Sequence, residues 1–206
     1  MSAAVAALFL NGGTIWHNWG VSAHQQPRRP RPPLNAEKLQ EMALRYVGRF
    51  ATSRSKLRTY LQRKVRERGW DGAQAPDFDR LAERFCELGY IDDAAYALSK
   101  SQSLVSRGYG KRRLEQKLRV DGIGEDDGEA ARALADEEAI ASALRFAKRR
   151  RIGPFSAGAS DPRQRDKAIG SLVRAGHAFG LAKAIAELPP SEEFDTDELR
   201  NRFADD

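Results

Sequence analysis

The sequence predicts an all-α protein without a sheet, built as three tandem three-helix repeats that form an elongated, curved array. Helix-favouring Ala, Leu, Arg, Glu and Lys dominate its 206 residues, whereas β-branched residues are sparse. Apolar residues recur at helical spacing, and the segments that carry them end at glycine or proline. Segments 43–46, 97–100 and 143–146 all begin with Ala-Leu and occupy equivalent first helices of the three units. Units of this length bury their apolar faces by packing against neighbouring units, which favours an array.

The first repeat is predicted at residues 35–91 and contains three helices. Their starts are marked by side chains that cap helix N-termini, namely Asn35, either Ser53 or Ser55, and Asp77. Their ends are expected at Phe50, Gly69 and Gly89. The buried face predicted for the first helix consists of Leu39, Met42, Ala43, Tyr46, Val47 and Phe50.

The second repeat is predicted at residues 92–137, with helices near 92–106, 111–120 and 126–135. Asp92 caps the first helix, and Gly122 ends the second. Leu114 and Leu118 form the buried face of the second helix, so its opposite face is expected to expose Lys111, Arg112, Lys117 and Arg119. The inward residues predicted for the first and third helices are Ala95, Leu98, Val105, Ala130, Ala131 and Leu134.

The third repeat is predicted at residues 138–189. Its first helix contains Ile140 and Ala147 and is expected to stop at Gly153-Pro154. Apolar residues at 168–173 and 181–188 indicate two more helices, the last of which precedes Pro189-Pro190. Residues 152–155 and 161–165 are assigned to a lengthened link between helices.

Two tails flank the repeats. Residues 1–34 are predicted to be a disordered Pro/Arg-rich tail, and residues 190–206 an acidic C-terminal tail. The apolar run at 3–10 follows no Lys or Arg and is too short to span a bilayer, so neither a signal peptide nor a membrane segment is predicted. A lone Cys86 forms no internal disulfide, which suits the reducing cytoplasm, where we expect the protein.

No catalytic group of residues emerges from the sequence. His17 and His24 fall in the predicted tail, and His177 falls at a helix junction, so no metal cluster or Cys-His dyad is predicted. Gly108 to Lys111 lack the spacing and the hydroxyl of a phosphate loop. The sequence therefore predicts a protein that is not an enzyme and has no cofactor.

Cations offer a better candidate for function. Four basic residues in succession, at 148–151, exceed what the C-terminus of a helix needs to balance its dipole. With other basic side chains they could form a discontinuous strip that binds a partner or DNA, although a merely solvated basic face is the alternative. The predicted binding set is Arg107, Tyr109, Lys111, Arg112, Arg113, Lys117, Arg119, Lys148, Arg149, Arg150, Arg151, Arg163, Arg165 and Lys167.

The second repeat also carries a family resemblance. Residues 89–93 read Gly-Tyr-Ile-Asp-Asp, and they are followed by Tyr96-Ala97, Arg107-Gly-Tyr-Gly, Arg113-Leu114, Leu118 and Gly122-Ile123. This order of residues resembles the central repeat of the RecX proteins, bacterial regulators of the RecA recombinase. One departure is Lys117, where the family usually has an acidic residue.

The resemblance implies three tandem three-helix repeats and a definite function. It implies a monomeric cytoplasmic protein that binds the RecA–DNA filament, meets single- or double-stranded DNA there, and modulates RecA recombinase, ATPase and coprotease activity, most often by inhibition. Inhibition would come from occupying the filament groove or disturbing subunit contacts. A helical nucleic-acid-binding protein that acts independently of RecA is the alternative, because the cation count alone would suffice for it.

Overall fold

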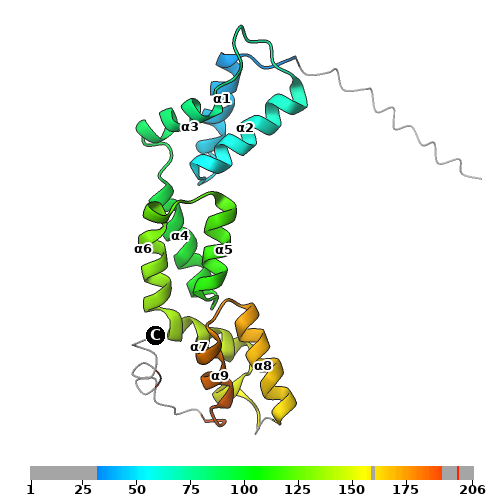
Figure 1. The fold of residues 1–206 in the computed structure, drawn as a ribbon, viewed down its shortest axis with the longest axis vertical. Helices are drawn as coiled ribbons and strands as arrows, with labels where there is room; N and C mark the ends of the chain where they lie inside the picture. The colour runs from blue at the N-terminus through cyan, green and yellow to red at the C-terminus, as the bar shows by residue number, and fades with distance from the viewer. Residues whose placement is uncertain (1–31, 159–160, 192–198, 200–206) are drawn as a thin grey trace, which may run out of the picture. The chain divides into compact units, whose positions relative to one another are not determined.

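The computed structural model describes residues 32–158, 161–191 and 199, and within them the protein is all-α, as predicted (Figure 1). Its only β-type pairing there is an isolated bridge between Leu34 and Trp70. Residues 1–31 of the predicted N-terminal tail, and 192–198 and 200–206 of the predicted C-terminal tail, lie outside the described residues. The elements in order are α1 (Ala36–Val47), α2 (Arg54–Arg68), α3 (Phe78–Glu87), α4 (Asp93–Ser106), α5 (Lys111–Asp121), α6 (Glu125–Glu137), α7 (Ala139–Arg150), the 3-10 turn η1 (Gly153–Phe155), α8 (Pro162–Arg174) and α9 (Phe179–Glu187).

Helices α1 to α3 pack around one apolar cluster. Their predicted caps are confirmed, because the side chains of Asn35, Ser53 and Asp77 each accept a backbone N–H from the third residue along the chain. The prediction for Phe50 was wrong. Helix α1 ends at Val47, so Phe50 falls beyond its last turn and its side chain is 55% exposed.

The folded region also begins earlier than predicted. Leu34, which was assigned to the tail, is fully buried in the same cluster as Leu39 and Leu57. Its backbone N–H donates to the Gly69 carbonyl at 3.0 Å, and its own carbonyl accepts from the N–H of Asp71 at 2.8 Å. These hydrogen bonds attach Leu34 to the residues that follow α2. Leu34 is in an isolated β-bridge rather than a helix, so helical periodicity could not predict its burial.

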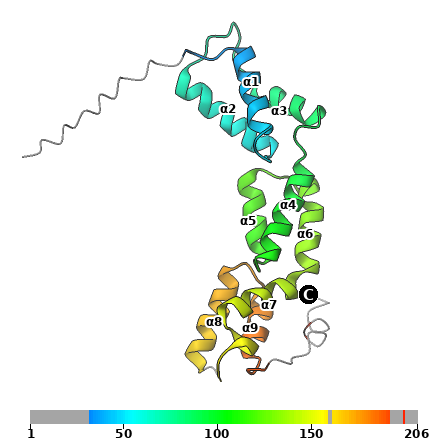
Figure 2. The same cartoon turned by 180° about the vertical axis from the view of Figure 1, so that it is seen from behind.

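Helices α4, α5 and α6 lie side by side in both views (Figure 1 and Figure 2). The predicted inward residues Ala95 and Ala130 are exposed, and Leu134 is only half-buried. Val105 and Ala131 are buried as predicted. The rest of the buried faces is formed by Tyr96, Ala97, Ser101 and Leu104 on α4, and by Gly128 and Ala135 on α6. Small side chains on both helices let the backbones approach closely, and the Ser101 hydroxyl donates to the Ala131 carbonyl at 2.7 Å.

The third set of helices corrects three more predictions. Helix α7 stops before Gly153, because Arg151 adopts a left-handed conformation with φ of 55°. Asp161 caps α8 through a reciprocal capping box with Gln164, so residues 162–165 are the first helical turn rather than part of a link. Leu199, assigned to the acidic tail, is buried in the cluster formed by α7, α8 and α9.

The junction between α2 and the second repeat is made by buried polar contacts. The Ser53 hydroxyl donates to the Asp121 carbonyl at 2.6 Å, and the backbone N–H of Arg54 donates to the Asp93 carboxylate at 2.9 Å. Asp93 therefore satisfies an N–H at the start of α2 while lying in the first turn of α4. These hydrogen bonds connect the start of α2 to α4 and α5, which are distant from it in the chain.

Candidate nucleic-acid interface

The turn at residues 107–110 lies against the third repeat. Gly108 has a left-handed φ of 76°, and a Cβ there would lie 2.7 Å from the backbone nitrogen of Phe146. The Gly110 N–H donates to the Ala175 carbonyl at 3.0 Å, and the Arg112 N–H donates to the Gly176 carbonyl at 3.1 Å. A side chain at 108 would prevent this close backbone approach, which explains the glycine there.

Two guanidinium groups lie near the ring of Tyr109 in this turn. Arg107 lies 5.7 Å and Arg149 lies 6.0 Å from the centroid of the Tyr109 ring. Arg149 also donates to the Arg107 carbonyl at 2.6 Å and lies 5.3 Å from the Phe146 ring. Arg149 thus joins the second and third repeats, and the cations and aromatic rings alternate across that join.

A groove of about 390 Å³ runs between α4 and α5, and Tyr109 lines it. Lys100, Arg107, Arg113 and Lys117 supply four cations to its walls, and no carboxylate side chain is among the described residues that line it. Its other lining residues are Ser103, Leu104, Gln116 and Val120. A polyanion entering this groove would meet positive charge and hydrogen-bond donors on both walls.

One buried carboxylate pairs with Lys117, which lines the groove, and with Lys56, which does not. Asp121 accepts from Lys117 at 2.8 Å and from the Tyr96 hydroxyl at 2.8 Å, and Lys56 lies 3.8 Å away. Burial alone would raise the pKa of Asp121, but the hydrogen bonds from Lys117 and Tyr96 outweigh it, so this pKa is lowered. Burial and the hydrogen bond to Asp121 raise the pKa of Tyr96. Asp121 therefore remains ionised and holds both ammonium groups in place.

A second basic hollow, of about 670 Å³, lies beside the end of α7. Arg150, Arg151 and Lys167 line it with Gln164 and Ser171, and the described part of the chain contributes no carboxylate to its lining. The left-handed conformation of Arg151 turns the chain at this point. Four residues of the predicted set, Lys148 to Arg151, lie at the end of α7, and a fifth, Lys167, lines the same hollow as Arg150 and Arg151.

The structure does not bring the whole predicted set together. Lys111 pairs with Asp136 at 2.6 Å, and neither Arg112 nor Arg119 lines the groove. Lys117 was predicted on the same outward face as these residues, but it lies in the groove wall with Arg113. Lys148 and Arg163 are exposed outside both hollows, and the Nε atom of Arg165 is buried without a hydrogen-bond partner among the described residues.

Sequence reasoning missed Lys100, Lys56 and Tyr96. Both ammonium groups lie over the Tyr96 ring, with Lys100 at 4.7 Å and Lys56 at 5.4 Å from its centroid. The i,i+4 spacing of Tyr96 and Lys100 on a helix could have indicated the first contact. Nothing local connects Lys56 to a ring 40 residues later in the chain.

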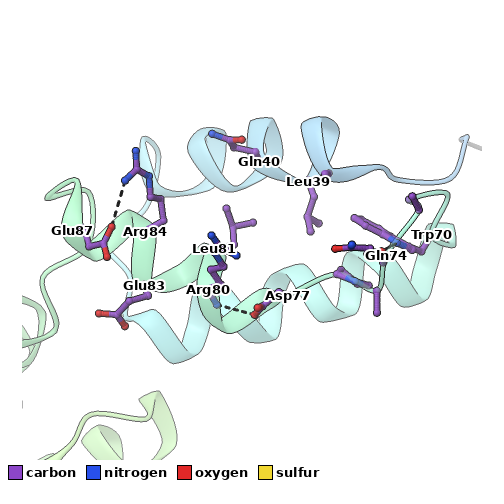
Figure 3. Close-up of a pocket in the computed structure, with 15 residues that line it drawn as sticks. Leu39, Gln40, Trp70, Gln74, Asp77, Arg80, Leu81, Glu83, Arg84 and Glu87 are labelled. Carbon is purple, nitrogen blue, oxygen red and sulfur yellow. Dashed lines mark hydrogen bonds and ion pairs between the residues drawn. The ribbon is translucent and has the colours of Figure 1, made fainter.

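A larger hollow of about 850 Å³ lies in the first repeat (Figure 3). Leu39, Trp70 and Leu81 line it together with charged residues from α3. Arg84 pairs with Glu87 at 3.5 Å, and the Asp77 side chain accepts the N–H of Arg80, as the dashed lines mark. Its lining mixes both signs of charge, so it is a weaker candidate for a polyanion than the groove.

His177 fastens the third repeat to the turn that carries Tyr109. Its Nε2 lies 3.1 Å from the Gly108 carbonyl, and the ring packs on Phe146 with centroids 6.1 Å apart. Burial lowers the pKa of His177, which outweighs the opposing effect of the Gly108 carbonyl. The neutral imidazole is therefore the form that the fold contains.

Acidification is expected to destabilise the protein, because it protonates His177 and so disfavours the buried neutral form. A histidine whose pKa is lowered on folding stabilises the fold fully above its ordinary pKa of about 6.5, and this stabilisation is lost as the pH falls through that value toward the folded pKa. We expect the urea midpoint of the parent to fall between about pH 7.5 and pH 5.5, and the His177→Gln variant to fall less. Equal pH dependence of the two proteins would contradict the assignment.

Within the residues that the structure describes, two features of other protein classes were not found. No group of three or more His, Cys, Asp or Glu side chains is arranged to hold a metal ion. No helix in the described ranges has the length and hydropathy needed to cross a membrane.

The chain is similar to known proteins in sequence and in fold. Residues 92–131 match the family model described as RecX, second three-helix domain. A regulatory protein RecX from Myxococcus xanthus is 30% identical over 176 residues, which cover 80% of this chain and 92% of that relative. A regulatory protein RecX from Agrobacterium fabrum is 29% identical over 142 residues, covering 68% and 76%.

The fold is shared with a crystal structure of RecX from Lactobacillus salivarius. The two superpose with a TM-score of 0.53 at 20% identity, covering 72% of this chain and 92% of that one. Because the sequence match with the Myxococcus xanthus relative spans almost its whole length, and the family model matches the repeat that holds the groove, the chain belongs to the RecX family of regulatory proteins.

Proposed function

We propose that this protein binds the RecA–DNA filament as a monomer and restrains the recombinase, ATPase and coprotease activities of RecA in DNA repair and the SOS response. Family membership supports a regulatory role. The observation that carries the contact with DNA is the groove between α4 and α5, whose described lining contains four cations and Tyr109 and no carboxylate. One of these cations, Lys117, also pairs with Asp121, which is outside the lining. Such a surface suits a phosphate backbone inside a filament groove.

Eight residues of the predicted binding set form two functional groups in this proposal. Arg107, Tyr109, Arg113 and Lys117 contact DNA at the groove. Arg149, Arg150, Arg151 and Lys167 extend the contact across the third repeat. Lys111 is given a structural role, because its ion pair with Asp136 already joins α5 to α6.

The test compares the parent with a triple variant, Arg149→Ala, Arg150→Ala and Arg151→Ala. We expect weaker binding to RecA–DNA filaments, weaker inhibition of strand exchange, and a log–log salt slope that falls by about 1 for each phosphate that the variant no longer neutralises. Arg150 and Arg151 are exposed cations that contribute little to stability, and Arg149 loses one exposed hydrogen bond to the Arg107 carbonyl, so we expect a small loss of stability with the fold retained, which circular dichroism checks. Filament binding is measured by fluorescence anisotropy over a series of salt concentrations.

The matched control is a triple change of acidic residues, Glu192→Ala, Glu193→Ala and Asp195→Ala. It changes net charge by the same amount in the opposite direction, so it is expected to leave filament binding unchanged or to strengthen it. A folded basic triple variant with unaltered inhibition and salt slope would rule out the contact at 149–151. The groove residues would then be the only site left in the proposal.

A second candidate function is nucleic-acid binding independent of RecA, which the same four groove cations favour. The two functions are separated by comparing naked single-stranded DNA with RecA-coated DNA in the same assay. Preference for the coated strand supports filament regulation. Equal or tighter binding to the naked strand supports the second candidate.

A further inference from the structure

The first repeat exposes an aromatic ring that its core does not use. Phe50 lies just beyond the end of α1, its side chain is 55% exposed, and it is not part of the apolar cluster of α1 to α3. Its ring meets Tyr46 with centroids 5.4 Å apart and an interplanar angle of 48°. An exposed phenylalanine leaves a large apolar surface in water, which a ligand could cover.

The Phe50 ring contacts a tyrosine that is itself held by the core of the first repeat. Tyr46 stacks on Tyr60 with centroids 4.1 Å apart and planes 15° from parallel. Both tyrosines pack against the buried cluster that contains Leu57 and Leu61. Phe50 is therefore the outer member of a row of three rings, of which the inner two are held by the core of the repeat.

Cations surround this row. The Arg49 guanidinium lies 6.0 Å from the Phe50 ring, and the charged groups of Arg63 and Lys64 lie 5.8 and 5.9 Å from the Tyr60 ring. Glu67 pairs with both Arg63 and Lys64. Arg49 has no ion pair with a carboxylate in the ranges that the structure covers, so its charge is available to a ligand.

We propose that Phe50 and Arg49 form a binding site for single-stranded nucleic acid, in which an unpaired base stacks on the Phe50 ring and an adjacent phosphate meets the Arg49 guanidinium. A stacking ring flanked by cations matches a ligand that alternates π faces with negative charges. A duplex keeps its base faces covered by neighbouring bases, so it cannot use the ring. This site goes beyond the proposed function, because it lies on the first repeat and uses neither the groove nor the cations at the end of α7; like the second candidate function, it requires no RecA.

Fluorescence anisotropy of the full chain with labelled oligo-dT, in the absence of RecA, tests the proposal. We expect Phe50→Ala to weaken binding by at least about fivefold, because stacking contributes about 1–3 kcal/mol per base. Its salt slope is expected to stay that of the parent, since no phosphate contact is removed. An abasic strand of the same length and a duplex are expected to bind parent and variant equally.

A matched control is Phe179→Ala, which removes another exposed phenylalanine, 59% exposed, from the third repeat. We expect it to bind oligo-dT like the parent. The Phe50→Trp variant should retain affinity and show quenching of its indole fluorescence when oligo-dT is added, which reports directly on stacking. Arg49→Ala is expected to lower the salt slope by about 1 for both the normal and the abasic strand.

The proposal is overturned if the parent does not bind oligo-dT, or if Phe50→Ala binds it as tightly as the parent. Equal weakening with oligo-dT and with the abasic strand would also overturn stacking. Loss of RecA-filament binding in Phe50→Ala with unaltered oligo-dT binding would assign this surface to a protein partner instead. None of these outcomes depends on the arginine variants, so this site and the filament proposal fail independently.

Discussion

Replacing Leu118 by alanine is expected to lower the free energy of unfolding by about 2–5 kcal/mol, and replacing Leu114 is expected to cost a similar amount. Both side chains are only 1% exposed and fill the space between α5 and the other two helices of the repeat. Alanine would remove apolar contacts and leave a cavity that the neighbouring helices could close only in part. Urea denaturation followed by circular dichroism measures the change.

The same helix offers a matched control. Val120 is 73% exposed, so Val120→Ala is expected to change stability by less than about 0.5 kcal/mol. It differs from the leucine variants in burial while sharing their helix. A Leu118→Ala protein as stable as Val120→Ala would show that α5 is not packed as described.

Replacing Asp121 by alanine is expected to destabilise the protein by about 3 kcal/mol. Removing one partner of a buried ion pair typically costs about 3–5 kcal/mol, and the lower end applies because Lys56 and Lys117 can turn toward water. The carboxylate is 3% exposed and is the shared partner of Lys117 and of the buried Tyr96 hydroxyl. Urea denaturation of Asp121→Ala and of the parent at neutral pH measures the difference in their free energies of unfolding.

Asp121→Asn is the matched control, because asparagine has nearly the same shape as aspartate and its amide oxygen can still accept from Tyr96. The substitution removes only the negative charge, so it measures the contribution of that charge to stability. The pKa of Asp121 is lowered on folding, so its stabilisation is fully present above the ordinary aspartate pKa of about 3.9 and is lost as the pH falls through the folded value. We expect the stability gap between parent and Asp121→Asn to narrow below about pH 4. A gap that does not change with pH would contradict a charge effect.

Local chemistry explains most of what the sequence predicted about the fold. Caps at Asn35, Ser53, Asp77 and Asp92 are confirmed because a short polar side chain satisfies nearby N–H groups whatever lies further away. Gly89, Gly108 and Gly122 all have left-handed φ values, as expected where helices end. The burial of Leu114 and Leu118 follows from their helical spacing.

Predictions failed where packing between helices overrode periodicity. Periodicity favoured Ala130, Ala131 and Leu134 as the inner face of α6, but of these three only Ala131 is buried, together with Gly128 and Ala135, where α4 packs closely. Arg151 ends α7 without glycine, which no propensity indicates. A helix selects its buried face according to the shape of its neighbour, and the sequence of one helix does not contain that shape.

The sequence alone therefore determined the all-α class, the side-chain caps that start four helices, and the residues that resemble the RecX family, because a cap depends on groups a few positions apart. Only the tertiary structure decided which charges meet. Arg149 reaches the Arg107 carbonyl across 42 positions, and Lys56 reaches Tyr96 across 40. Phe50 was predicted to be buried, but its side chain is 55% exposed. Contacts between such distant residues depend on how the helices pack, and local periodicity carries no information about that packing.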